Sequence, residues 1–397
     1  MILPTLIGAA SIRERIDLRI DQDLRPDIPA LNSLAVGSLV SLFDEKAGLF
    51  SKRISLTEAG LHREKVSRKL TAIALLGLKR LEASGATIPF DIVSIQDAVW
   101  KDRSWVKRIG DLGLLTWFTA TCCPERLDDL FREYDFGHAL TSYSDARAAR
   151  TAGLAWFLAG IAHARFACPN AALDLTDVAV ETYQLLENNQ GEGGIFGRAA
   201  IPQFSPQAIF NRFGTFPDQI FAIYALTTFA RAFQIDEPLE GALACANSLR
   251  ALQGEMGQWW FLYDRSTCRA VSRYPVLSVH QDGTAPIGLL AVGEATGQSF
   301  HESIYKGLSW IAGANELGDD LRDLDRQLIW DSIDSKSTLA NYWEAALSFA
   351  SASRVPAAHK LQIRYAAGPD HFGWLLYAFG EFGLSRPDIA ARAATAR

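Results

Sequence analysis

The chain has 397 residues, of which 49% are hydrophobic and 21% are charged, and its net charge at pH 7 is −6. These values are typical of a globular protein with a sizeable core and exclude a disordered chain. The charges form no long basic run, so we expect no binding to nucleic acid. No stretch reaches the roughly 18 consecutive apolar residues of a membrane span, although peripheral membrane contact stays open.

The start of the chain indicates its compartment. No positive charge precedes Arg13, and Glu14 follows it before a signal-like apolar segment develops, so we expect a cytoplasmic protein. The five cysteines form no CxxC pair, and we interpret them as reduced thiols: Cys122, Cys123, Cys168, Cys245 and Cys268.

Most long segments carry apolar residues at positions i, i+3, i+4 and i+7, which is the spacing of helices. In chain order, this spacing predicts helices near 70–83, 151–167, 222–233 and 301–313. Alternating strand patterns are few and short. The sequence therefore predicts a mainly α protein.

A loop followed by a helix recurs along the chain. The copies are DEKAGLF (44–50), QGEGGIF (190–196) and QGEMGQW (253–259), with a degenerate fourth copy within 364–379. Repeated helical hairpins bury their apolar faces only by stacking or by closing into a ring. We therefore expect an all-α, α6/α6-type barrel of helical hairpins, an α/α toroid. It is expected to form one domain over 1–397, with repeats recognisable over about 40–380.

Two of these loops carry a family motif. The third copy reads QxxxGxW and the second reads QxxxGxF, which resembles the QW repeats of the terpenoid-cyclase and protein-prenyltransferase superfamily. The first copy has Asp44 in place of the glutamine and is only similar.

A second motif narrows the resemblance. Residues His280 to Ala285 read HQDGTA, which resembles the DxDDTA and DCTAE motifs of class II cyclases, with Asp282 in the place of the general acid. His280, Gly283 and Pro286 replace the other acidic positions of those motifs. The resemblance implies a class II-type terpene cyclase that protonates a small hydrophobic isoprenoid without a metal or other cofactor.

Asp282 and His280 are the expected catalytic residues. A buried carboxyl has a raised pKa and stays neutral until it gives up its proton, and a nearby cationic donor stabilises the carboxylate that remains. The alternative is that Asp282 only caps the following helix and that His280 is a structural residue. Aromatic faces would stabilise a carbocation. The candidates for this role are Trp259, Trp260, Tyr274, Tyr365, His371 and Trp374, each with core packing as the alternative.

Two other functions remain open. Asp218 precedes the helix of the second repeat near the register of Asp282, and a pair of carboxyls suits a carbohydrate-active toroid, either a hydrolase, a lyase or an epimerase. The auxiliary residues of such a site would be Glu192, Glu255, Arg273, Tyr274 and His280. The third alternative is a repeat scaffold that binds a partner without catalysis.

One further pattern concerns metals. Asp319 to Asp323 read DDxxD, a magnesium-diphosphate motif, but the charges around them alternate in sign as on a solvated helix face. We therefore expect no metal site there. The loop GEGGIFG (191–197) lacks the Lys and Ser of a phosphate-binding loop.

Overall fold

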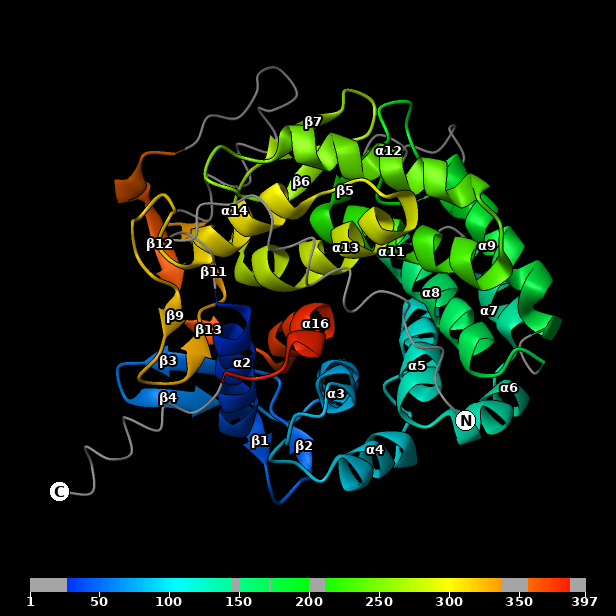
Figure 1. Cartoon of the computed structure of the whole chain (residues 1–397), viewed down its shortest axis with the longest axis horizontal. Helices are drawn as coiled ribbons and strands as arrows, with labels where there is room; N and C mark the ends of the chain where they lie inside the picture. Colours follow the sequence, from blue (N-terminus) through cyan, green and yellow to red (C-terminus); the bar gives the residue numbers. More distant parts are fainter. Residues whose placement is uncertain (1–26, 145–149, 171–172, 200–210, 337–355, 386–397) are drawn as a thin grey trace.

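The computed structural model describes residues 27–144, 150–170, 173–199, 211–336 and 356–385. Twelve helices of this part pair into six hairpins, and the second helix of each hairpin belongs to an inner ring (Figure 1). The inner helices are α3 (Arg68–Ala83), α5 (Ile109–Cys122), α8 (Thr151–Ala167), α11 (Phe216–Phe233), α13 (Ala285–Thr296) and α16 (Pro369–Phe379).

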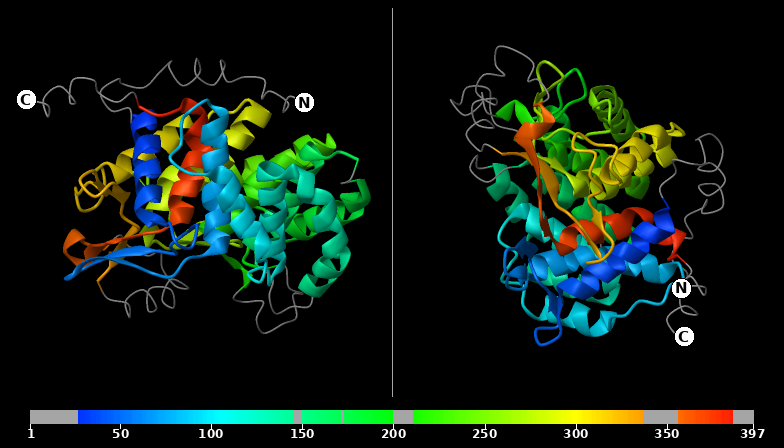
Figure 2. Two further views of the ribbon diagram at one scale, coloured as in Figure 1. Left: turned by 90° about the horizontal axis from the view of Figure 1, so that it is seen from below. Right: turned by 90° about the vertical axis from the view of Figure 1, so that its left-hand side faces the viewer.

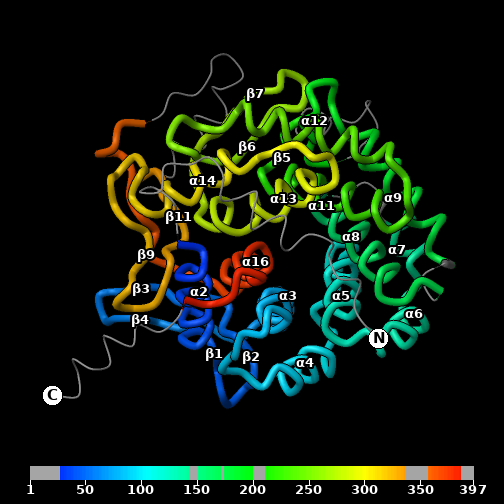
Figure 3. Tube along the Cα trace, viewed as in Figure 1, coloured from blue at the N-terminus to red at the C-terminus, as the bar shows by residue number. Residues whose placement is uncertain are grey.

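Each inner helix contacts the next one along the chain, and α16 contacts both α13 and α3. The ring is therefore closed, as the tube in Figure 3 shows. This closure confirms the predicted α/α toroid. The outer helices are α2 (Ile28–Leu42), α4 (Ile92–Lys101), α7 (Phe136–Ser144) with α6 (Leu127–Glu133) before it, α9 (Thr176–Asn188), α12 (Glu237–Leu252) and α14 (His301–Ile311).

Glycines set the close spacing of the inner helices. A Cβ on Gly77 of α3 would collide with the carbonyl oxygen of Gly373 on α16, and a Cβ on Gly373 would lie 2.6 Å from the oxygen of Ile73. Between α5 and α8, a Cβ on Gly160 would collide with Gly113 O, and a Cβ on Gly113 would collide with the backbone of Phe157. The inner helices are buried almost all round, because they face the ring axis, two inner neighbours and the outer ring.

Short strands gather where the inner helices begin, at the end of the ring that we call the N-terminal end. The left view of Figure 2 shows the blue and orange strands at one end of the helices. The sheets are β13-β3-β4, β5-β6-β7 and β12-β11-β8, with the two-stranded pairs β1-β2 and β9-β10. Their bounds are β1 Phe43–Asp44, β2 Leu49–Phe50, β3 Ile54–Thr57, β4 Gly60–Arg63, β5 Phe213–Thr215, β6 Leu262–Asp264, β7 Arg269–Ser272, β8 Val276–Leu277, β9 Arg322–Asp323, β10 Leu328–Ile329, β11 Ser332–Ser335, β12 Leu361–Arg364 and β13 Ala366–Ala367.

The two QW-like loops have one structural role. Gln253 Nε2 donates to Gly257 O and to Ser303 O of α14, both at 2.9 Å. Gln190 Nε2 donates to Gly194 O and to Gly241 O of α12, both at 2.8 Å. Each glutamine thus fixes its own loop and ties it to the next outer helix.

The loop glycines complete this docking. Gly194 and Gly257 have φ values of +80° and +96°, which favour glycine, and a Cβ on Gly257 would collide with the Lys306 backbone. The first sequence copy differs, because Asp44 only closes the β1–β2 turn by accepting from Ala47 N at 2.9 Å. The motif is therefore a device for joining hairpins of the toroid.

The predicted helices agree with the structure. The prediction for 151–167 matches α8, while 70–83, 222–233 and 301–313 fall on α3, α11 and α14 with shifted ends. In the described ranges, no helix has the length and apolar character needed to cross a membrane.

Candidate active site

Aromatic side chains fill the centre of the ring in layers. Trp156, Phe221 and Trp374 are each the sixth residue of their inner helix, with ring centroids 5.2 to 6.2 Å apart. Trp117, Tyr224 and Tyr377 are each the ninth residue, and Trp117 stacks on Tyr224 at 5.0 Å. Side chains at the same position of different inner helices meet because these helices run parallel and in register. Their first turns therefore all lie at the N-terminal end of the ring.

Asp282 lies at this end in an unusual backbone segment. Residues His280–Thr284 form one turn of π-helix, labelled η4, directly before α13. Such turns are rare and often occur at functional sites. Asp282 is fully buried, and the N-cap of α13, Thr284, has no side-chain capping bond. The cap that the sequence allowed for Asp282 is therefore not its role.

Asp282 instead forms a pair with His371 of α16. His371 Nε2 lies 2.8 Å from Oδ1 and 2.9 Å from Oδ2 of Asp282. His371 is 5% exposed, so the pair is almost completely removed from water. Gly283 allows this contact, since a Cβ there would lie 3.0 Å from Trp374 Cβ.

The pKa directions follow from this pairing. Burial raises the pKa of Asp282, and His371 opposes the shift. Burial alone would lower the pKa of His371, but the carboxylates of Asp282, Asp370 and Asp331 outweigh it and raise that pKa above 6.5. The pair is therefore suited to hold a proton at neutral pH.

His280 has a different environment from the one expected for a proton donor. Its ring lies 4.6 Å from that of Phe216, and its Nδ1 has no partner among the described residues. Burial, with a smaller contribution from His371, lowers the pKa of His280 to about 3, so the ring is neutral. His280 is not among the hydrogen-bond partners of Asp282 that the structure shows.

Asp218 ties two inner helices together. Its Oδ2 accepts from Thr215 N at 2.8 Å and Thr215 Oγ1 at 2.7 Å, as the N3 residue of a capping box on α11. Its Oδ1 accepts from Ala152 N of α8 at 2.9 Å. Burial raises the pKa of Asp218, although these hydrogen bonds act to lower it. Both oxygens are therefore engaged in holding the ring together.

Two more carboxylates lie beside His371. Asp370 precedes it in the first turn of α16 and is partly exposed. Asp331, between β10 and β11, forms an ion pair with Arg364 at 3.6 Å. Burial raises the pKa of both carboxyls, while His371 and Arg53 lower it. A partly exposed acid thus accompanies the buried pair.

The aromatic candidates occupy several places. Trp374 belongs to the central layer, one helical turn beyond His371. Trp259 is buried near Phe216 at 5.6 Å, and Trp260 is buried between Tyr274 and Arg273. Tyr274 donates to Glu316 Oε1 at 2.5 Å, whereas Tyr365 is 48% exposed against Trp330. Of these six candidates, His371 and Trp374 are the two that lie on α16 close to Asp282.

Two aspartates of the DDxxD motif form ion pairs with nearby arginines. Arg322 pairs with Asp320 at 2.8 Å, and Arg326 pairs with Asp323 at 2.9 Å around the β9–β10 turn. The DDxxD residues therefore lie on a hairpin and not on the helix face that the sequence indicated. Over the described ranges, no cluster of three or more His, Cys, Asp or Glu is arranged to hold a metal ion.

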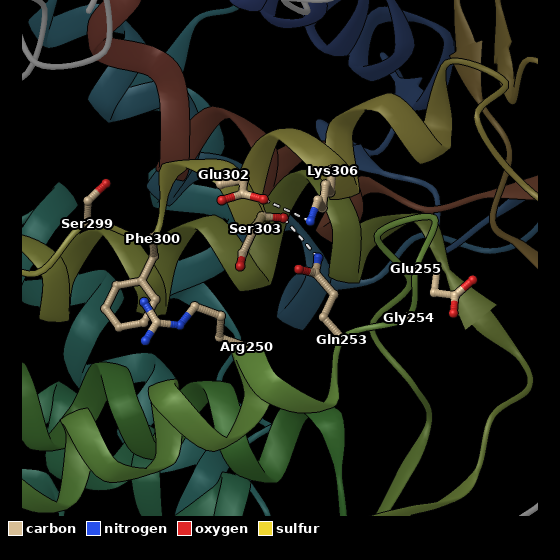
Figure 4. A pocket seen from close by; sticks show the side chains of 9 residues that line it. All are labelled: Arg250, Gln253, Gly254, Glu255, Ser299, Phe300, Glu302, Ser303 and Lys306. Atoms are coloured by element: carbon tan, nitrogen blue, oxygen red, sulfur yellow. Dashed lines mark hydrogen bonds and ion pairs between the residues drawn. The ribbon is translucent and has the colours of Figure 1, made fainter. Parts of the chain in front are cut away.

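A polar pocket of about 200 Å³ lies on the outer ring between α12 and α14 (Figure 4). Its cations are already engaged, because Lys306 pairs with Glu302 at 2.9 Å and Arg250 lies over the Phe300 ring at 5.3 Å. Glu255, an auxiliary candidate from the sequence, lines this pocket and so lies on the outer ring.

The fold has known counterparts. An unsaturated glucuronyl hydrolase from Streptococcus agalactiae, in complex with dGlcA-GalNAc6S, is 11% identical with a TM-score of 0.59, over 93% of this chain and 94% of that one. The cellobiose 2-epimerase of Bacillus thermoamylovorans is 9% identical with a TM-score of 0.57, over 89% and 99%. A possible GH105 member from Salmonella enterica is 13% identical with a TM-score of 0.55, over 92% and 95%.

These similarities show that the chain has the α/α toroid fold shared by these enzymes. No model of a known protein family matches the chain. A search of curated proteins also finds no significant match.

The structural comparisons correct the first functional hypothesis. The similar solved structures are enzymes of carbohydrates, so a terpene cyclase with an isoprenoid partner is wrong. The physical reason lies in the two motifs. QxxxGxW docks one hairpin on the next, and Asp282 faces an imidazole among other carboxylates where a cyclase acid would face an apolar cavity.

Proposed function

We propose that the protein is a carbohydrate-active enzyme in which His371 transfers a proton to or from a sugar and Asp282 positions His371. The observation that carries this proposal is the buried Asp282–His371 pair in a π-turn at the N-terminal end of the ring. A carboxylate bound to one nitrogen of an imidazole fixes the ring orientation and stabilises its protonated form.

A sugar substrate suits the surroundings of the pair. Sugars present hydroxyl groups to polar side chains and apolar ring faces to aromatic ones. The carboxyls of Asp370 and Asp331 act electrostatically on His371, and Trp374 of the aromatic layer follows His371 by one turn of α16. The carbohydrate enzymes with a similar fold support the same substrate class.

Two reactions share the proposed step. In glycoside hydrolysis, an acid protonates the leaving glycosidic oxygen as its bond to the sugar carbon breaks. A second carboxylate, the role we assign to Asp370, takes a proton from the water that bonds to that carbon. In epimerisation, a base removes a proton next to a carbonyl and an acid returns it to the other face. The products distinguish the two, since hydrolysis shortens the sugar and epimerisation keeps its mass.

A panel of oligosaccharides tests the proposal. Products are followed by mass spectrometry for cleavage and by NMR for epimerisation, with wild type, Asp282→Asn and His371→Asn. We expect turnover of a sugar by the wild type and strong losses in both variants, while His359→Asn, a change of an exposed histidine, keeps full activity. Turnover that both variants retain overturns the assigned pair. Binding without turnover by the wild type supports a non-catalytic scaffold.

A further inference from the structure

Lys69 lies at a position in its helix where a positive charge is unfavourable. It is the second residue of α3, where the partial positive charge of the helix N-terminus disfavours a cation. Its ammonium group nevertheless lies at the N-terminal end of the ring, and its side chain is 37% exposed. Residues that break a local rule often serve function.

Asp111 holds Lys69 in place. Asp111 Oδ1 lies 2.6 Å from Lys69 Nζ, and Oδ2 accepts from the backbone N of Lys107 and Arg108, both at 3.2 Å. Asp111 is the N3 residue of α5 and 6% exposed, so it is a fixed anchor. One of the three donors of Lys69 is thereby used.

Trp156 of α8 completes the cluster. Lys69 Nζ lies 5.3 Å from the centre of the Trp156 ring, which is partly exposed. Trp156 lies 6.2 Å from Trp374, and Trp374 follows His371 by three residues on the same face of α16. Lys69 and His371 are the second and third residues of α3 and α16, two inner helices in contact, so the cluster lies at the same end of the ring as the proposed proton donor.

We propose that Lys69, Asp111 and Trp156 form a subsite for an uncharged sugar residue next to the residue that reacts. This inference rests on the proposed function. Lys69 has two donors left for sugar hydroxyls, Asp111 fixes their direction, and an indole face covers the apolar side of a sugar ring. The substrate is then a disaccharide or longer.

The charges around the cluster favour an uncharged residue. Lys69, His371 and Arg364 are each paired with a carboxylate: Asp111, Asp282 and Asp331. Asp218 and Asp370 add two further carboxyls at the same end, where burial raises the pKa of both against the opposing charges of Arg198 and Arg53. The ionised carboxylate of an acidic sugar would enter a region in which burial already disfavours the ionised form of the protein's own carboxyls.

Matched disaccharides test this inference by calorimetry. Cellobiose, lactose and maltose are compared with counterparts that carry a uronic acid at the non-reducing end, so that each pair differs only in oxidation at C6. We expect at least one neutral sugar to bind about tenfold or more tightly than its acidic counterpart. Lys69→Met and Trp156→Leu should each weaken that binding about tenfold or more.

Two control variants separate recognition from folding. Lys79→Met removes a lysine of α3 that pairs with Glu82 at 2.6 Å, and Trp100→Leu removes a tryptophan under Arg103 at 4.6 Å. Both should bind like the wild type, and all variants should show a folded circular dichroism spectrum.

The outcomes are distinguishable. Tighter binding of the acidic sugars, or unchanged binding in folded Lys69→Met and Trp156→Leu, overturns the subsite and leaves the proposed function standing. Failure of all six sugars to bind overturns the subsite as well. Failure of the proposed function is read separately, from full turnover in His371→Asn.

Discussion

His371 and Asp282 are 89 residues apart in the sequence, yet Nε2 of the histidine contacts both oxygens of the aspartate at 2.8 and 2.9 Å. The contact joins the last inner helix, α16, to the π-turn that begins α13. It therefore stabilises the closure of the ring, and in the proposed function it also prepares the group that transfers a proton.

The raised pKa values predict how stability depends on pH. A group whose pKa is raised by folding stabilises the protein below its ordinary pKa, and this contribution is lost as the pH rises through the raised value. Folding raises the pKa of His371 above 6.5 and the pKa of Asp282 above 3.8. The unfolding free energy of the wild type should therefore exceed that of His371→Asn most below pH 6.5, as long as Asp282 is ionised. Urea titrations at several pH values should show the gap shrinking above that point, and a gap that widens with pH contradicts the pairing.

Replacing His280 should change the pH dependence of stability in the opposite direction to replacing His371. Its Nδ1 is buried without a partner in the described part, and its pKa of about 3 keeps it neutral across the working range. His280→Leu removes this unsatisfied atom, so we expect an unfolding free energy within about 1 kcal/mol of the wild type above pH 6.5. Below pH 6.5 the variant should gain relative to the wild type, because only the unfolded wild type takes up a proton on His280 there. A loss above about 3 kcal/mol in denaturant unfolding would show that His280 holds the site together.

The inner ring should not tolerate a methyl group at its closure. Gly373→Ala places a Cβ 2.6 Å from Ile73 O and 2.8 Å from Ala74 Cα, so we expect a loss of about 1–3 kcal/mol or more. Gly137→Ala on the outer helix α7 is the control, since its Cβ would meet one atom at 3.5 Å. The control should be neutral or slightly stabilising. Equal melting temperatures for the two variants would show that the ring relaxes freely.

The two loop glutamines should matter for stability. Gln190→Ala and Gln253→Ala each remove two hydrogen bonds to carbonyls, and we expect a loss of about 1–3 kcal/mol for each. Gln362→Ala, on the exposed side of β12, should be silent in the same chemical denaturation experiment. No change in either loop variant would refute the docking role of the motif.

The sequence predicted the fold because the fold depends on local patterns. Helical spacing marked the inner helices α3, α8 and α11 and the outer helix α14, and the recurring glutamine and glycine marked the loops that join the hairpins. Gln253 and Gln190 indeed make equivalent contacts. The motif nevertheless misled about chemistry, since joining hairpins is a need of any toroid whatever its substrate.

The site was harder to predict because its partners meet through ring closure. His371 was a candidate, but its contact with Asp282 depends on α16 reaching α13, and the nearer His280 was the natural choice. Lys69 and Asp111 were missed entirely. The sequence did contain a signal for Asp111. It follows Arg108 by three residues, as Asp218 follows Thr215, and this spacing marks the first turn of an inner helix in both cases.

The most direct test compares the two histidines on whichever sugar the enzyme converts. Proton transfer by a positioned side chain contributes about 10²–10⁴-fold to a rate. The account predicts that His371→Asn lowers kcat by that order while His280→Asn retains most of it, with both proteins folded. Equal losses in the two variants, or a larger loss for His280→Asn, would contradict the assignment of His371 as the proton carrier.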